Sequence, residues 1–300
     1  MKLAAIDIGS NAVRLQITRI IEYQEKITFK KLEYVRFPIR LGQDVFSIGH
    51  ISPQRKTNLF KLLRAFKHII DLYEIDHYYG CATSAMRESE NGSEICSEIK
   101  STLGLPIQIL SGTQEAEMIN RVIQTYIDDQ NHLHIDVGGG STELNLYVNR
   151  EKVLSHSFPI GSVRSGHSDD VKQTRHSLLH WIDRSIHKKY GRIRAIGTGG
   201  NINKIFELAK GDKRRRISID TVMAVHQTIQ HTSPEDRINR LQLNPDRAEV
   251  ILPAAEIYID VMKAAHARSI LVPSVGLKDG INYYLYEKHY PGEGKIIVKN

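Results

Sequence analysis

The sequence predicts an α/β protein built from two similar domains, and three observations lead to this prediction. Three hundred residues are more than one hydrophobic core usually serves. Apolar, strand-like segments alternate with segments of helical spacing along most of the chain. The opening stretch "AAIDIGSNAVRL" (Ala4–Leu15) has a counterpart in "HIDVGGGSTEL" (His134–Leu144), which places Asp7 and Asp136 129 positions apart. Two copies of one domain type, meeting across a cleft, explain these observations most simply.

The first half of the chain should begin with an antiparallel meander and continue as alternating helices and strands. β-branched residues separated by turn signals indicate strands at Lys2–Asp7, Val13–Ile21 and Ile27–Val35. Ser52 and Pro53 then have the residue types of an N-cap and of a first helical position. The other elements expected here are a strand at Tyr78–Ala82, a helix at Gly92–Leu103, a strand at Ile107–Leu110 and a helix whose capping box is formed by Ser111 and Gln114.

The second half repeats the pattern. The elements expected are a strand at Leu133–Val137, a hairpin of Glu143–Tyr147 with Val153–Phe158, a helix at Asp170–Tyr190, a strand at Ile193–Ile196, three helices up to about Ala267, a strand in "SILVPSV" and a last helix in "LKDGINYYLYEKHY". The domain boundary is expected within Asn120–Asn131. We therefore assign residues 1–125 to one domain and 126–300 to the other, with the last helix as a candidate to pack back on the first domain.

Composition limits the class of partner and the compartment. The formal net charge of +7 favours anionic partners, but charge alone cannot choose among nucleic acid, membrane surfaces and phosphate-rich small molecules. The basic run "GDKRRRIS" (Gly211–Ser218) has no interleaved aromatic residue, so a solvated loop is favoured over a binding patch, and nucleic acid is not expected. No apolar run is long enough for a membrane span, and no signal peptide is apparent. Two cysteines, Cys81 and Cys96, fit packing roles in a reducing cytoplasm.

The two glycine-rich turns are candidate phosphate sites. A strand that ends in Asp and turns at once through glycine exposes several backbone N–H groups, and neighbouring hydroxyl and amide groups add donors. A pair of capped tight turns is the alternative, but its repetition favours phosphate binding. A third loop, "AIGTGGNINK" (Ala195–Lys204), also opens a helix. None of the three is a Walker A loop or a G-x-G-x-x-G loop, and Ser141 is not in a nucleophile elbow. The expected phosphate-binding residues are Gly9, Ser10, Asn11, Gly138, Gly139, Gly140 and Ser141.

The carboxylates beside these turns indicate a cation. A carboxylate next to a phosphate would repel it, so Asp7, Asp136 and Glu143 require a positive charge between them and the phosphate. Mg²⁺ is the expected ion, with Mn²⁺ as the alternative, because Mg²⁺ is usually held by one or two carboxylates, waters and phosphate oxygens.

Eight motifs occur in the order of a known family. They are "AIDIGSNAVRL", "ATSAMRES", "SGTQEAE", "IDVGGGSTEL", "FPIGSVR", "IGTGGNINK", "DRAEVILPAAEI" and "PSVGLKDG", and they span Ala5 to Gly280. On these motifs the sequence resembles the exopolyphosphatase/guanosine pentaphosphate phosphohydrolase family. The resemblance implies an actin-like ATPase fold: two ribonuclease-H-like domains, each with a mixed five-stranded sheet flanked by helices, and an active site in the interdomain cleft.

The resemblance also assigns roles. It implies Mg²⁺-dependent release of the terminal phosphate from polyphosphate, with Glu115 as the catalytic glutamate and Arg87 as the phosphate-binding arginine. Asp136 and Glu143 match the metal-associated carboxylates, and Asp7 is their symmetric partner. Gln114 stands where the family commonly has an acidic residue, and Glu117 stands where it commonly has a basic one.

Several readings stay open at this stage. The substrate is polyphosphate or guanosine pentaphosphate, and a polymer would favour a basic track formed by Lys204, Lys213, Arg214, Arg215, Arg216 and Lys278. A non-catalytic sensor of phosphorylated nucleotides and a kinase on the same fold are the alternatives from other classes. A homodimer is a default expectation from the frequency of two-fold symmetry rather than a deduction from residues.

Overall fold

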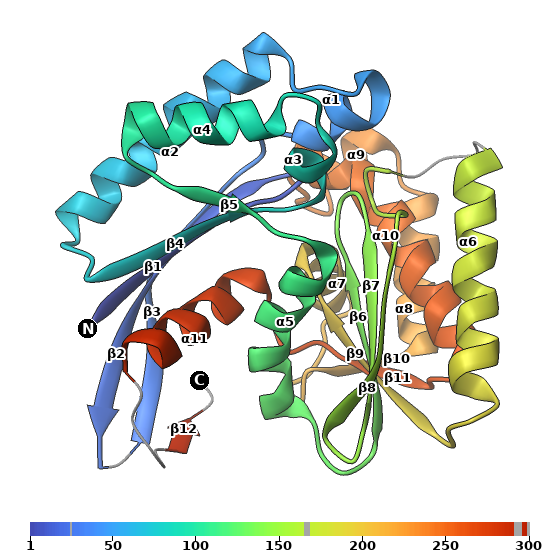
Figure 1. Ribbon diagram of the computed structural model, residues 1–300. Coiled ribbons are helices and arrows are strands. Elements are labelled where there is room, and N and C mark those ends of the chain that lie inside the picture. Colours follow the sequence, from blue (N-terminus) through green and yellow to red (C-terminus); the bar gives the residue numbers. More distant parts are fainter. Residues whose placement is uncertain (25, 165–168, 291–295, 299–300) are drawn as a thin grey trace. The chain divides into compact units, whose positions relative to one another are not determined.

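The computed structural model describes residues 1–24, 26–164, 169–290 and 296–298 (Figure 1). The chain divides into two compact units. The first combines Met1–Thr125 with Gly276–Asn300, and the second is Tyr126–Val275. Because the segment after Val275 belongs to the first unit, the second unit is shorter than the expected 126–300.

The first unit is built on a mixed sheet with the strand order β12-β3-β2-β1-β4-β5. β1 pairs antiparallel with β2 and parallel with β4, so it lies in the middle of the sheet. Figure 1 shows α2 and α4 on one face of this sheet and α11 on the other. The bounds are β1 Lys2–Ile8, β2 Val13–Tyr23, β3 Lys26–Phe37, α1 Leu41–Ile48, α2 Pro53–Leu72, β4 His77–Ala82, α3 Ser84–Glu88, α4 Gly92–Leu103, β5 Ile107–Ile109, α5 Gly112–Ile123, α11 Leu277–His289 and β12 Ile296–Val298.

Local sequence signals fix several helix starts in this unit. The Ser52 hydroxyl accepts the amide of Arg55 at the start of α2, with Pro53 as the first helical residue. Ser111 and Gln114 form both hydrogen bonds of the expected capping box at the start of α5. Each satisfies backbone donors that a helix start leaves without a helical partner.

Helix α11 brings the end of the chain onto the first sheet. The ring of Tyr283 stacks on Phe29 of β3 with a centroid distance of 4.3 Å. The Gln16 amide on β2 donates to the Asp279 carboxylate over 3.0 Å. Burial of aromatic surface and these polar contacts hold α11 to the first unit although it is distant in sequence.

The second unit has a mixed sheet with the order β10-β11-β9-β6-β7-β8. β6 occupies the place that β1 has in the first sheet, since it pairs antiparallel with β7 and parallel with β9. Its core joins one face of the sheet to helices α6, α7, α8 and α10. The bounds are β6 Asn131–Val137, β7 Thr142–Val148, β8 Glu151–Phe158, α6 Asp169–Ile182, β9 Ile193–Thr198, α7 Gly200–Leu208, β10 Arg216–Ser218, α8 Ile219–Gln230, α9 Pro234–Asn239, α10 Pro245–Ala264 and β11 Ser269–Leu271.

The structure corrects four details of the expected organisation. Each sheet has six strands in the described part of the chain rather than five, because β12 and β10 extend the edges. The chain between β9 and β11 holds four helices instead of three. Short helices α1 and α3 were not expected. A π-helical turn at Asp183–His187 follows α6, where one continuous helix was expected. Short elements like these carry too few residues to show a period in sequence.

Within the described ranges, no helix combines the length and the apolar character that crossing a bilayer requires. Both cysteines are free and buried. Burial raises the pKa of the Cys96 thiol to about 11, so this thiol stays protonated at neutral pH, as a packing residue would.

A substitution at Gly280 tests the docking of α11. A Cβ at Gly280 would lie 2.1 Å from the Met118 carbonyl oxygen of α5, so the two helices would have to separate. We expect Gly280→Ala to lower the free energy of unfolding by about 1–3 kcal/mol, since overpacking outweighs the helix propensity of Ala. Urea unfolding measures this change. The matched control is Gly276→Ala at the start of the same helix, where a Cβ meets nothing within 4 Å. Equal stability of the two variants would contradict the close packing of α11 on α5.

Candidate active site

The first group of predicted residues gathers at the end of β1. Asp7 lies directly opposite Arg14 of β2, and the Arg14 Nη1 atom is 2.6 Å from the Asp7 Oδ2 atom. The turn between them is closed by a hydrogen bond of 3.1 Å from the Gly9 amide to the Ala12 carbonyl. Asp7 is therefore ion-paired with the Arg14 guanidinium, which would compete with a metal ion for the Asp7 carboxylate.

The turn after β1 is held by the segments around it. The Ser10 hydroxyl is 2.7 Å from the Ser84 hydroxyl at the start of α3. The Gly42 amide donates to the Ser10 carbonyl over 2.7 Å, and the Arg40 amide donates to the Asn11 carbonyl over 2.9 Å. These contacts fix the backbone of the turn, which is the condition for presenting phosphate donors in one geometry.

Arg87 and Glu115 come together near the same strand ends. The Arg87 Nη1 atom donates to the Leu110 carbonyl over 2.8 Å and is 3.9 Å from the Glu115 Oε2 atom. Glu115 lies in the first turn of α5, immediately after the capping box. Arg87 is thus oriented by the chain just before α5, so that its charge lies beside the Glu115 carboxylate.

The charges of Asp7 and Glu115 both act on the buried thiol of Cys81. Cys81 of β4 is directly opposite Asp7 in the parallel pairing with β1. Burial raises the pKa of this thiol well above its ordinary value, and the negative charges of Asp7 and Glu115 raise it further. Both carboxylates therefore act on one thiol. We call Asp7, Ser10, Arg14, Arg87 and Glu115 the first cluster.

The second group gathers at the end of β6. Asp136 is directly opposite Glu143 of β7, so both carboxylates lie on one face of the sheet at neighbouring positions. A hydrogen bond of 2.9 Å from the Gly138 amide to the Ser141 carbonyl closes the turn. The Glu143 Oε1 atom is buried and accepts the hydroxyls of Ser141 at 2.6 Å and Ser157 at 3.0 Å. The Ser141 hydroxyl thus orients Glu143.

The glycine turn after β6 is clamped through its carbonyl oxygens. The Gly138 carbonyl accepts the amide of Ser162 at 2.9 Å, and the Gly139 carbonyl accepts the amide of Val163 at 2.8 Å. Among the described residues, nothing accepts a hydrogen bond from the Gly139 or Gly140 amide. A loop with fixed carbonyls and available amides has the donor set of an anion-binding nest.

A buried polar layer supports these strand ends. The Tyr258 hydroxyl of α10 accepts the Val137 amide at 3.3 Å and donates to the Thr198 carbonyl. Burial, and then the charge of Asp136, raise the pKa of this phenol well above its ordinary value, so it remains a donor. His134 bonds Thr198 through its Nε2 atom at 2.8 Å, and burial lowers the pKa of His134 to about 3, so its ring stays neutral. We call Asp136, the Gly138–Ser141 turn and Glu143 the second cluster.

The two clusters are built by the same type of turn, and comparison of the two turns identifies Arg14, which was not among the site residues expected from the sequence. In each unit the middle strand ends in Asp, glycine two positions later donates across the turn, and the residue seven positions after the Asp faces it. That facing residue is Glu143 in the second unit and Arg14 in the first. The signal was present in the sequence, because Arg14 and Glu143 are separated by the same 129 positions as Asp7 and Asp136.

The second cluster fits a divalent cation better than the first. Asp136 and Glu143 provide two adjacent carboxylates beside backbone donors, which is the ligand pattern of a hydrated Mg²⁺ ion on phosphate. No set of three or more His, Cys, Asp or Glu side chains that could enclose a metal occurs in the described ranges. The side chains therefore suit an ion that keeps most of its water ligands rather than one held in a protein cage.

The two units carry similar mixed sheets with a cluster of polar side chains at the end of each middle strand, and comparison with known proteins gives the family. Residues 20–289 match the Ppx/GppA phosphatase family, so the chain belongs to this family. It is similar to a crystal structure of an exopolyphosphatase from Cytophaga hutchinsonii, with a TM-score of 0.83, 21% identity and coverage of 96% of this chain and 98% of that one. The Aquifex aeolicus member of the family gives a TM-score of 0.76 at 22% identity, covering 97% and 99%. These two likenesses establish the fold.

Two relatives with curated names complete the comparison. A putative exopolyphosphatase of Haemophilus influenzae is 23% identical over 304 aligned positions, covering 96% of this chain and 92% of that protein. A bifunctional 3-dehydroquinate synthase/phosphatase of Fusobacterium nucleatum is 35% identical over 167 residues. That match covers 54% of this chain and only 25% of the Fusobacterium protein.

Gly161 tests the clamp on the glycine turn. A Cβ at Gly161 would lie 2.5 Å from the Gly139 carbonyl oxygen and 2.8 Å from the Gly140 nitrogen, so it would push the turn away. We expect Gly161→Ala to lower the unfolding free energy by about 1–3 kcal/mol and to reduce phosphate release at least about tenfold. Chemical unfolding and a phosphate-release assay measure the two effects. Gly191→Ala is the control, since a Cβ there meets nothing within 4 Å. Full activity of Gly161→Ala would show that the turn does not bind phosphate.

Proposed function

We propose that this protein is a Mg²⁺-dependent exopolyphosphatase that hydrolyses the terminal phosphoanhydride bond of inorganic polyphosphate and releases orthophosphate. The observation that carries the proposal is the pairing of Asp136 with Glu143 at strand ends, beside a glycine turn whose carbonyls are clamped. This arrangement combines a cation site with amide donors for phosphate oxygens. The name of the Haemophilus relative, a putative exopolyphosphatase, supports the same activity.

The second cluster would bind the metal and the phosphate. Asp136 and Glu143 would hold Mg²⁺ together with water, and the ion would neutralise negative charge on the phosphate oxygens. The Gly139 and Gly140 amides would donate to those oxygens. Ser141 and Ser157 keep Glu143 in place by hydrogen bonds of 2.6 and 3.0 Å, so this carboxylate does not have to reorient when an ion binds.

The first cluster would supply the water and the positive charge. Glu115 would take a proton from a water molecule as the water oxygen forms a bond to the terminal phosphorus. The bond from that phosphorus to the bridging oxygen breaks, and the electron pair leaves with the shortened chain. Arg87 would compensate the charge on the transferring phosphoryl group, for which a permanently charged guanidinium is suited. A binding protein would have no use for a water-activating glutamate, which disfavours the sensor alternative.

Guanosine pentaphosphate is the alternative substrate. Its guanine would need an aromatic or hydrogen-bonding platform, and the Tyr258 ring beside the second cluster commits its hydroxyl to Val137 and Thr198. A substrate made only of phosphates needs no such platform. Polyphosphate is therefore the favoured substrate.

Replacing Glu115 tests the catalytic assignment. We expect Glu115→Gln to lower the rate of phosphate release from polyphosphate about 10²–10⁴-fold, because an amide cannot accept the proton of the water. Glu117→Gln is the matched control, since Glu117 is exposed on the same helix, and its rate should stay within about twofold of wild type. Both proteins are assayed with polyphosphate and with guanosine pentaphosphate at saturating Mg²⁺. A fully active Glu115→Gln protein would overturn the role of Glu115, and an inert wild type with both substrates would overturn the enzyme.

Replacing Asp136 tests the metal assignment. We expect Asp136→Asn to raise the Mg²⁺ concentration for half-maximal activity at least about tenfold, because a neutral amide attracts the cation less than a carboxylate does. Calorimetric titration of Mg²⁺ into the protein with orthophosphate present should show the same loss of affinity. Asp170→Asn, an exposed aspartate in the same unit, is the control. An unchanged Mg²⁺ requirement in Asp136→Asn would place the ion elsewhere.

A further inference from the structure

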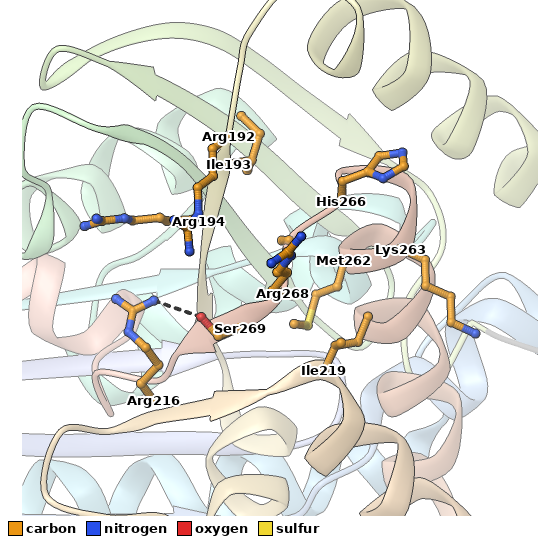
Figure 2. Close-up of a pocket in the computed structure, with 11 residues that line it drawn as sticks. Arg192, Ile193, Arg194, Arg216, Ile219, Met262, Lys263, His266, Arg268 and Ser269 are labelled. Atoms are coloured by element: carbon orange, nitrogen blue, oxygen red, sulfur yellow. Dashed lines mark hydrogen bonds between the residues drawn. The ribbon is translucent and has the colours of Figure 1, made fainter.

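A basic cavity of about 790 Å³ lies in the second unit, apart from the second cluster. Figure 2 shows the side chains around it, which come from the start of β9, from β10 and the start of α8, and from the end of α10 through the start of β11. Its volume falls within the range of about 300–1,000 Å³ that small-molecule sites usually have. The basic residues of its lining are Arg192, Arg194, Arg216, Lys263, His266 and Arg268.

The cavity and the second cluster lie at opposite ends of the same strands. β6, β9 and β11 are parallel, and their carboxyl ends carry the glycine turn after Val137 and the loop at Gly199. Arg192 and Arg268 precede β9 and β11, so they lie at the amino ends. β9 has six residues, which at about 3.3 Å each gives a separation of about 20 Å. A ligand in the cavity therefore would not compete with one held by Asp136 and Glu143.

Asp128 is the acidic residue that the described contacts place beside the arginines of the cavity, where it acts on both Arg194 and Arg216. No Asp or Glu is among the described residues that line it. Arg194 has an ion pair with Asp128, with the Arg194 Nη1 atom 2.9 Å from the Asp128 Oδ2 atom, whereas Arg216 donates over 3.3 Å to the neutral hydroxyl of Ser269. Burial lowers the pKa of Arg216, and the positive charge of Arg194 lowers it further. Guanidinium groups gathered in this way repel one another, and an anion between them would remove the repulsion.

The floor of the cavity indicates which anion fits. Ile193, Met262 and Ala267 are buried and belong to the core of the second unit, so the floor is fixed by packing. No Phe, Tyr or Trp is among the described lining residues. Single-stranded nucleic acids bind through aromatic stacking platforms in addition to charge, and this cavity provides only the charge.

From this combination we propose that the cavity is a second anion site, which binds a short oligophosphate by its phosphate groups alone. Guanidinium forks match phosphate oxygens in geometry, and several of them converge here on one concave surface. The site is additional to the proposed catalytic one and does not depend on metal.

Part of the basic run Gly211–Ser218 lines the cavity. Arg216 enters β10 and lines the cavity, whereas the Arg215 guanidinium stacks on Phe206 at 4.3 Å and bonds the Val272 carbonyl. The run was expected to be a solvated loop, and for Arg216 this expectation is wrong. Two lysines that were expected to belong to a basic track form ion pairs with nearby carboxylates. Lys204 pairs with Glu207, and Lys278 of the first unit pairs with Asp279.

Charge reversal at the cavity is the test, with inorganic tripolyphosphate as the probe. Calorimetric titration is done with Glu115→Gln protein in EDTA, so that neither turnover nor metal-dependent binding contributes. Adding Arg192→Glu and Arg268→Glu, both at exposed positions, should weaken tripolyphosphate binding at least about tenfold and leave the thermal midpoint unchanged. Lys61→Glu with Arg64→Glu, exposed on α2, makes the same change in net charge and should alter the affinity less than about twofold.

Three other outcomes would overturn the proposal. Equal weakening by both charge reversals would mean non-specific attraction to a basic protein, and no weakening by either would mean that the cavity is not the site. Tighter binding of a single-stranded oligonucleotide than of tripolyphosphate, lost in the cavity variant, would make this a nucleic-acid site. If the Arg192/Arg268 variant lowers the thermal midpoint, Arg192→Gln with Arg268→Gln takes its place and should weaken binding at least about threefold.

The test separates this proposal from the catalytic one. In the wild-type Glu115 background with Mg²⁺, the Arg192/Arg268 variant should hydrolyse polyphosphate at the wild-type maximal rate. If wild type is inert but tripolyphosphate binding depends on Arg192 and Arg268, the catalytic proposal fails and the anion site stands. If wild type hydrolyses polyphosphate but the cavity variant binds tripolyphosphate normally, the anion-site proposal fails and the catalytic proposal stands.

Discussion

The site depends on the facing of two side chains across the turn that ends the middle strand of each sheet. Antiparallel pairing brings residues seven positions apart to within a few ångströms of each other. In the first unit this produces the Asp7–Arg14 ion pair, which is neutral as a whole. In the second unit it places the Asp136 carboxylate opposite the Glu143 carboxylate, two like charges beside the glycine turn. Such a pair is costly unless a cation joins it, so one backbone motif gives the two units different chemistry.

The surrounding structure serves to keep these turns fixed. Ser162 and Val163 occupy the carbonyls of the second turn and leave its amides for a ligand. In the first unit, the Leu110 carbonyl, just before α5, accepts a hydrogen bond from the Arg87 guanidinium and orients it. Donors that are already oriented stabilise a developing charge without reorganisation, which is the usual basis of phosphoryl-transfer catalysis. The basic cavity lies at the other end of the second sheet, where the same parallel strands begin, so the two proposed anion sites are at opposite ends of one sheet.

Much of the fold was predictable because its signals are local. The spacing of Ser111 and Gln114 defined the start of α5, and both hydrogen bonds of that capping box are present. The repeated Asp–glycine pattern predicted two related sheets. Short elements such as α3 and β10 were missed, because three to five residues contain no measurable period. Arg14 was also missed, although the 129-residue repeat aligned it with Glu143.

By itself, the sequence determined the fold class, the two glycine turns and the residue types on which the proposed metal-assisted activity rests, because each lies in a contiguous stretch of the chain. Only the tertiary structure decided which side chains face one another. Strand register placed Arg14 opposite Asp7, where a metal ion had been expected. It also placed Cys81 of β4 opposite Asp7. Packing of the segment after Val275 on the first sheet made that unit discontinuous. The basic cavity likewise joins residues from three separate stretches, and only the packing of β9, β10, β11 and α10 brings their charges together.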